Sequence, residues 1–152
     1  MMEGTSRLRA LASGVRFGRF VSVGIMGALL DVTVLVVLTE GFGVLPELAT
    51  LVGIESAILL MFAINERWTF AGEGSPGRWP LLRRLARSHG VRAAGSLTQF
   101  VLFVVMYRYV TVGLSAWGID LWLVIAKVGA IGIAVLVNYT FESLFTWRVH
   151  RG

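Results

Sequence analysis

The sequence predicts an all-α fold, an integral membrane four-helix bundle built from two parallel two-helix repeats. The composition is the first reason, because 56% of the residues are hydrophobic and only 15% are charged, with a mean hydropathy of +0.76. A soluble domain carries roughly 25% charged residues, so a membrane is the natural solvent for this chain. Four apolar stretches are the second reason, and an alternation of basic and acidic connections is the third.

The four apolar stretches lie at about residues 20–38, 48–64, 93–112 and 121–141, within a single domain over residues 1–152. Each is near the ~20 residues that cross the hydrocarbon layer as a helix. We expect helices because backbone groups must be satisfied internally in lipid. The first stretch follows basic residues, but it is longer than the apolar region of a signal peptide and no cleavage site clearly follows it. We therefore expect a retained span.

The connections between the stretches differ in charge. Lysine and arginine gather before the first span, in the loop 65–92 and in the C-terminal tail, whereas residues 39–47 and 113–120 carry only acidic charge. The positive-inside rule then predicts a multi-pass protein of the cytoplasmic membrane, with both termini and the loop 65–92 on the cytoplasmic side. The net charge of +5 is explained by this topology and by anionic lipid head groups, so we do not expect nucleic acid as a partner.

The loop 65–92 contains a segment, residues 81–87, in which apolar and basic residues recur at helical spacing. This pattern is typical of an amphipathic helix at a membrane interface. Such a helix could serve only as a positively charged anchor, or it could gather phosphate-bearing lipids or an acidic partner. In the second interpretation, the attracting residues are the arginines of this loop, Arg83, Arg84, Arg87 and Arg92.

Three charged residues, Asp31, Glu55 and Lys127, interrupt the predicted spans. A charge at the middle of a bilayer costs ~2.5–3.5 kcal/mol on insertion scales, so each needs an explanation. Counting helical rise from the outer ends of the spans places all three at a similar depth, where they could meet. One interpretation is a structural ion pair of Lys127 with Glu55 or Asp31 that fixes helix register. The other is a site for a polar or charged group of a substrate.

Two helical faces carry further polar residues. In the third span, a stripe at three-to-four spacing climbs from the cytoplasmic surface towards the middle, through His89, Arg92, Ser96 and Gln99. In the fourth span, Lys127 shares a face with Asn138. Together these faces could line a polar cavity. Small residues that would allow close packing, and with it a homo-oligomer, are Gly24, Gly27, Gly129 and Gly132.

The sequence contains no recognisable catalytic constellation. It lacks a Gly-x-Ser-x-Gly elbow, a Walker-type phosphate loop and a His-Glu-x-x-His motif. There is no cysteine, and the two histidines, His89 and His150, are far apart in sequence, which makes a poor metal site. We therefore expect neither an enzyme nor a bound metal or cofactor.

The two halves of the chain end in related polar-aromatic segments. The first half opens with Arg-Phe-Val-Ser-Val-Gly at residues 19–24 and closes with Asn-Glu-Arg-Trp-Thr-Phe at residues 65–70. The second half matches more loosely, with Asn-Tyr-Thr-Phe at residues 138–141 and Phe-Thr-Trp-Arg at residues 145–148. On these motifs the chain resembles the GtrA-like family of small four-span membrane proteins, over roughly residues 16–149.

The match to this pattern is incomplete in the second half. Aligning the two endings places Glu142 opposite Asn65, and Asn138 opposite Met61, so each half keeps one of the two expected asparagines. The charge within the span is also different, because the second half has Lys127 and not a second glutamate.

The resemblance implies a role in cell-surface polysaccharide or glycan synthesis. Members of this family are thought to move polyprenyl-phosphate-linked sugars across the membrane, or to assist the glycosyltransferases that make or use them. In the first case, the four loop arginines would attract the phosphate. The residues expected to contact the head group in transit are Glu55, Lys127, Asp31, Asn65, Asn138 and Gln99.

Two alternatives have different requirements. A non-transporting adaptor that recruits a glycosyltransferase would depend on the cytoplasmic loop and tail. A small proton-coupled exporter of cations or drugs would use Glu55 or Asp31 as its acid, although Lys127 in the same cavity would repel a cationic substrate.

Overall fold

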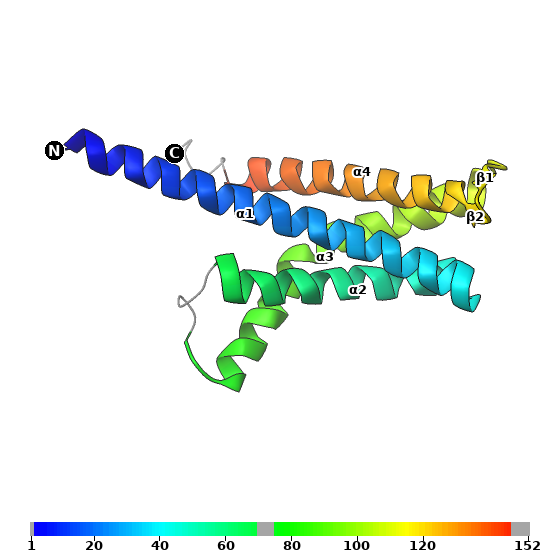
Figure 1. Cartoon of the computed structure of the whole chain (residues 1–152), viewed down its shortest axis with the longest axis horizontal. Coiled ribbons are helices and arrows are strands. Elements are labelled where there is room, and N and C mark those ends of the chain that lie inside the picture. Colours follow the sequence, from blue (N-terminus) through cyan, green and yellow to red (C-terminus); the bar gives the residue numbers. More distant parts are fainter. Residues whose placement is uncertain (1, 70–74, 147–152) are drawn as a thin grey trace.

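The computed structural model describes residues 2–69 and 75–146, and it is an all-α membrane bundle, as the sequence predicts. Three helices carry stretches long and apolar enough to cross a membrane, namely Val21–Gly41, Pro46–Trp68 and Arg78–Tyr109, and the fourth has a shorter apolar stretch, Leu121–Val137. Successive helices run in opposite directions (Figure 1). The four helices are α1 (Met2–Val36), α2 (Pro46–Ile64), α3 (Arg78–Tyr109) and α4 (Leu121–Thr146).

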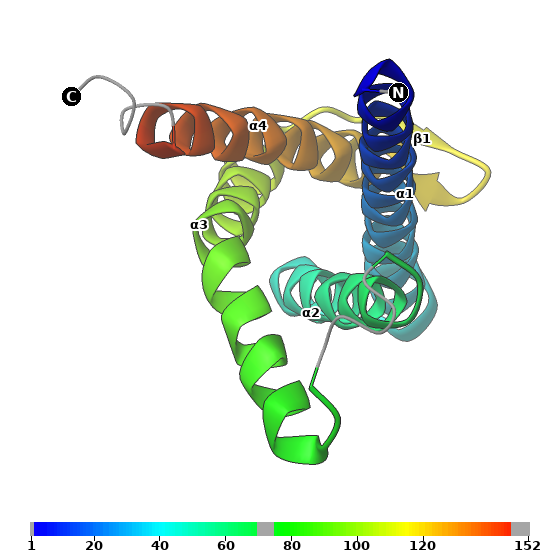
Figure 2. The ribbon, with the colours of Figure 1, turned by 90° about the vertical axis from the view of Figure 1, so that its left-hand side faces the viewer.

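The helices form a ring in which each packs against its neighbours in the chain, and α4 packs against α1 (Figure 2). The hairpins α1–α2 and α3–α4 are the most extensive pairs, and both run in the same direction, as a parallel repeat requires. The helices α1 and α3, and likewise α2 and α4, therefore lie diagonally across the bundle.

Helix α3 joins two features that the sequence presents separately. The basic segment 81–87 and the third apolar stretch form one continuous helix, which ends at Tyr109, three residues before the predicted limit. The residues between them, Ser-His-Gly-Val-Arg at 88–92, include Gly90, which is a poor helix former, but α3 continues through them without a break. The helix starts after Gly77, whose φ is 117°, and its first turns diverge from the rest of the bundle (Figure 2).

The helix ends include structures that periodicity did not predict. Helices α1 and α2 each finish in a π-helical turn, η1 (Val37–Gly41) and η2 (Asn65–Thr69), and η2 holds most of the first closing motif. Strands β1 (Ser115–Ala116) and β2 (Ile119–Asp120) form an antiparallel hairpin before α4. Its two turn residues, Trp117 and Gly118, both have positive φ, as a type I′ turn requires.

Asp120 anchors the start of α4. Its Oδ1 accepts hydrogen bonds from the backbone amides of Trp122, at 2.9 Å, and Leu123, at 3.4 Å, which is an N-cap arrangement. Its Oδ2 accepts a hydrogen bond of 3.2 Å from the hydroxyl of Tyr107 at the end of α3. A single carboxylate thus begins α4 and connects it to the preceding helix.

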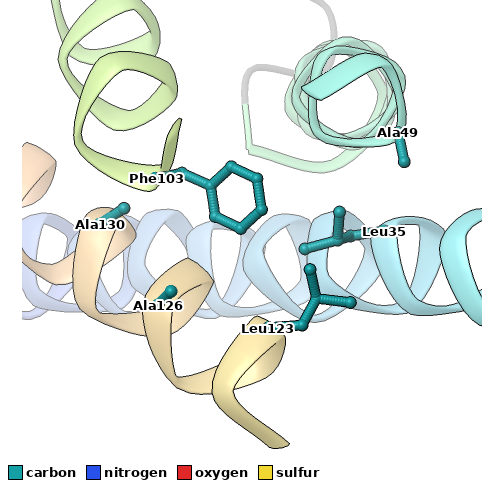
Figure 3. Close-up of a cluster of buried hydrophobic side chains, with 6 residues drawn as sticks. All are labelled: Leu35, Ala49, Phe103, Leu123, Ala126 and Ala130. Carbon is teal, nitrogen blue, oxygen red and sulfur yellow. The ribbon is translucent and has the colours of Figure 1, made fainter. Parts of the chain in front are cut away.

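The apolar core takes side chains from all four helices. Phe103 of α3 lies between Leu35 of α1 and the alanines of α4 (Figure 3). The fully buried cluster consists of Leu35, Ala49, Phe103, Leu123, Ala126 and Ala130. Its small members on α2 and α4 let these helices approach the centre of the bundle closely, as in other membrane bundles.

The internal repeat extends to the buried faces of α2 and α4. The register that aligns the two closing motifs also aligns eight buried residues in four pairs: Ala49 with Ala126, Thr50 with Lys127, Gly53 with Ala130, and Ala57 with Ala134. Seven of these eight are small, so the second helix of each half presents the same small-residue surface to the interior. Lys127 is the exception.

Gly53 sets the distance between α1 and α2. A Cβ atom at this position would overlap the Asp31 carboxylate and would lie 2.8 Å from the backbone carbonyl oxygen of Asp31. Backbone cannot move aside as a flexible side chain can, so α1 and α2 could not keep their present contact.

We expect Gly53→Ala to destabilise the protein by about 1–3 kcal/mol, as overpacking in a close-packed core does. Thermal unfolding of the purified protein in detergent measures this. The control is Gly24→Ala on α1, where an added Cβ meets nothing within 4 Å. Equal melting temperatures for the two variants would contradict the conclusion that Gly53 sets the distance between α1 and α2.

Candidate functional site

A network of buried polar side chains lies at the centre of the bundle. The Lys127 ammonium on α4 is 2.8 Å from Oδ1 of Asp31 on α1, and the two side chains are 0% and 3% exposed. Lys127 also donates a hydrogen bond to Oγ1 of Thr50 on α2, and the Gln99 amide on α3 donates one to Oδ2 of Asp31. We call these four residues, one from each helix, the central polar cluster.

The central polar cluster shows which carboxylate pairs with Lys127, a choice that the sequence left open. Lys127 pairs with Asp31 and not with Glu55. The reason is the rotation of α2: Glu55 follows Gly53 by two residues, which turns it by about 200° from the face that contacts Asp31. Thr50 lies one turn before Gly53 on the buried face and therefore reaches Lys127.

Thr50 is the member of this cluster that sequence reasoning missed. A threonine in an apolar span carries no charge and attracts no attention by itself. The signal was present in the repeat, because the register of the closing motifs places Thr50 opposite Lys127. The aromatic ring of Phe103 completes the surroundings of the ammonium, with Nζ 5.7 Å from the ring centroid.

Glu55 forms a second, more accessible pair with His89 of α3. The imidazole Nε2 lies 2.9 Å and 3.1 Å from the two carboxylate oxygens, and Nδ1 lies 3.0 Å from the backbone carbonyl of Leu85. The Glu55 side chain is 53% exposed and that of His89 is 34% exposed. This pair therefore differs from the central polar cluster in being open to the surroundings of the bundle.

Arg92 follows His89 by almost one turn of α3 and is half-buried. Its guanidinium donates to the sulfur of Met61 on α2, with Nη1 3.0 Å from Sδ. The contacts of His89, Arg92 and Gln99 are thus with α1 or α2, so these three residues of the polar stripe of α3 face the first hairpin.

The other loop arginines have different surroundings. Arg84 binds both carboxylate oxygens of Glu66 in η2 and donates to the carbonyl of Ser75, whereas Arg83 and Arg87 are exposed. Arg84 therefore holds the end of α2 to the start of α3, and its charge is already paired.

The two predicted asparagines are less informative. Asn65 is half-buried at the start of η2. Asn138 lies in α4, but its side chain, like residues 147–152, is outside the described part of the structure. Within the described residues, no group of three or more histidine, aspartate and glutamate side chains could hold a metal ion.

The opening and closing motifs of the first half meet in space. Arg19 of α1 lies over the indole of Trp68 in η2, with 5.2 Å between the guanidinium carbon and the ring centroid, and its Nη1 is 3.4 Å from the Trp68 carbonyl oxygen. The two motifs therefore have a structural function, because their contact holds α1 and η2 together at the open end of the α1–α2 hairpin.

Comparison with known families decides the identity of the domain. The family described as GtrA/DPMS, transmembrane domain, matches residues 19–147. The chain belongs to this family. No solved structure matches the chain.

The matched region of this GtrA/DPMS domain begins at Arg19 and ends at Trp147. It therefore contains both repeats, the central polar cluster, and Glu55, His89 and Arg92. The resemblance inferred from the motifs is thereby confirmed. Membership connects the protein with glycan or lipid-linked sugar processes in a membrane.

The buried Asp31–Lys127 pair generates a prediction about stability. Removing one partner leaves an uncompensated buried charge, which costs about 3–5 kcal/mol. We therefore expect Lys127→Met and Asp31→Asn each to lower the melting temperature in detergent strongly, and the double variant to recover most of the loss. If the double variant is as unstable as the sum of the single variants, the two charges do not depend on each other.

Proposed function

We propose that the protein moves the polar head of a polyprenyl-phosphate-linked sugar across the cytoplasmic membrane. One observation carries the proposal. The polar stripe of α3 leads from the half-buried His89 and Arg92 to Gln99, which binds the central polar cluster. These polar side chains lie on the side of α3 that contacts α1 and α2, in a helix that is otherwise apolar enough to span a membrane.

The chemistry of the substrate fits a path along these side chains. The long polyprenyl tail can remain in lipid, whereas the sugar and phosphate lose their hydration and need polar partners inside the membrane. Exposed Arg83 and Arg87 at the start of α3 would attract the phosphate. Glu55, His89 and Arg92 would then be the first intramembrane groups to meet the head.

The central polar cluster would act later in this sequence. Asp31 and Lys127 are enclosed by protein, so a head group would reach them, together with Gln99, only when the helices separate. Asn65 and Asn138 are proposed as contacts of the head group at the cytoplasmic end of the path.

A second candidate function is that of a membrane adaptor for a glycosyltransferase. A shallow pocket of about 230 Å³ lies where α2 ends and α3 begins, and Trp79, two residues before the pocket residue Leu81, is 76% exposed. An apolar side chain of a partner protein could occupy this pocket, which is lined by Phe62, Ala63, Glu66, Arg67 and Leu81.

Translocation can be measured with purified protein in liposomes that contain a polyprenyl-phosphate-linked sugar. We expect Glu55→Ala to slow translocation about tenfold or more, equivalent to ~1.4 kcal/mol in the barrier. We expect the charge-neutral double variant Asp31→Asn/Lys127→Met to do the same, because it lacks the charges of the central polar cluster.

The matched control is Glu40→Gln, which removes an exposed carboxylate at the opposite end of α1 from the loop arginines. It should translocate at the rate of the unmodified protein. Wild-type rates for both Glu55→Ala and the double variant would exclude the proposed path. If instead deletion of the Trp79 side chain abolishes sugar transfer in cells while those variants are active, the adaptor function is favoured.

The proposed orientation, with both termini cytoplasmic, can be tested directly because the chain contains no cysteine. Ser75 precedes α3 and Ser115 lies in the β-hairpin, and both are exposed. In intact cells, an impermeant thiol reagent should label Ser115→Cys but not Ser75→Cys. Labelling of Ser75→Cys alone would reverse the orientation.

A further inference from the structure

The Glu55–His89 contact holds a carboxylate in a position that suits another anion. Both carboxylate oxygens of Glu55 lie within 3.1 Å of a single ring nitrogen, Nε2 of His89. The other nitrogen, Nδ1, faces the Leu85 carbonyl, which can only accept, so Nδ1 carries a hydrogen. A contact between Nε2 and a carboxylate oxygen then requires one proton more, on the imidazole or on Glu55. The pair as a whole is neutral.

Arg92 adds a positive charge that this pair does not balance. Its nitrogen contacts the thioether of Met61, which is a weak acceptor and carries no charge. Within the described residues Arg92 makes no ion pair, although its half-buried guanidinium is placed along an apolar span. The group of His89, Arg92 and Glu55 therefore carries a net positive charge and lacks an anion.

The group is also accessible from the side of the bundle. Glu55 is 53% exposed and His89 is 34% exposed, whereas Lys127, which pairs with the Asp31 carboxylate, is fully enclosed. An anion with an apolar tail could approach through the surrounding lipid and reach this position without opening the bundle. A free anion would have to come from water.

We propose that His89 and Arg92 form a binding site for a phosphate group, in which Glu55 occupies the position of the phosphate while the site is empty. On binding, a phosphate oxygen replaces the Glu55 carboxylate at Nε2 of His89, and Arg92 exchanges the Met61 sulfur for a second phosphate oxygen. Charge-assisted contacts of this kind are stronger than the contact with a thioether.

This inference rests on the proposed function, since it identifies the part of the lipid-linked substrate that the protein holds first. It predicts that neutralising different residues of this one site has opposite effects on ligand binding. Glu55 competes with the ligand, so its neutralisation strengthens binding and slows release of the ligand, which agrees with the slower translocation expected of Glu55→Ala. His89 and Arg92 contact the ligand, so their neutralisation weakens it.

The experiment measures binding of undecaprenyl phosphate to the full chain in phosphatidylcholine nanodiscs, with undecaprenol and inorganic phosphate as parallel probes. We expect Arg92→Gln and His89→Gln each to weaken binding of the phosphorylated lipid by about tenfold, the scale of one charged hydrogen bond. We expect Glu55→Gln to strengthen it severalfold. Undecaprenol should bind weakly and respond to none of these variants.

The ion pair of Glu47 and Arg108 provides the control, because it joins the same two helices near their other ends. Glu47→Gln removes the same charge and should leave binding unchanged. An equal gain from Glu47→Gln and Glu55→Gln would overturn the proposal, as would unchanged binding in Arg92→Gln. Equal affinity for inorganic phosphate, with the same order of variants, would assign the site to the free anion. Binding with the expected order but no translocation would retain this site and reject the proposed transport.

Discussion

The bundle depends on polar contacts that cross its centre. Helices α1 and α3 are diagonal to each other, as are α2 and α4, and each diagonal is bridged by one hydrogen bond, from Gln99 to Asp31 and from Lys127 to Thr50. The Asp31–Lys127 ion pair connects the two diagonals. In lipid, apolar surfaces gain little by meeting each other, so such contacts specify which helices associate and at what depth.

The protein therefore separates two kinds of intramembrane charge. Those at the centre are enclosed and paired with each other, whereas Glu55, His89 and Arg92 lie closer to the surface and their charges are incompletely balanced. The first kind can stabilise one arrangement of the helices. The second can respond to a ligand without breaking that arrangement, as the first step of the proposed transport requires of a small, close-packed bundle.

The sequence was sufficient to predict the four helices, because hydropathy in a membrane protein determines which segments span the membrane. It also identified Asp31, Lys127 and the stripe that contains Gln99. The choice of Asp31 over Glu55 as the partner of Lys127 depends on the rotation of α2, which Gly53 determines through a backbone contact. The positive φ of Trp117 and the π-helical turns depend on how helix ends meet neighbouring segments, and hydropathy does not report this.

The equivalence of Thr50 and Lys127 in the repeat has an evolutionary consequence. Two separate, identical hairpins related by a two-fold axis would place the same residue on both sides of that axis, either two threonines or two lysines. Neither arrangement gives the single Asp31–Lys127 pair with a threonine opposite the lysine that the structure shows. An asymmetric centre of this kind needs two halves that differ in sequence, and one chain that encodes both halves allows them to differ.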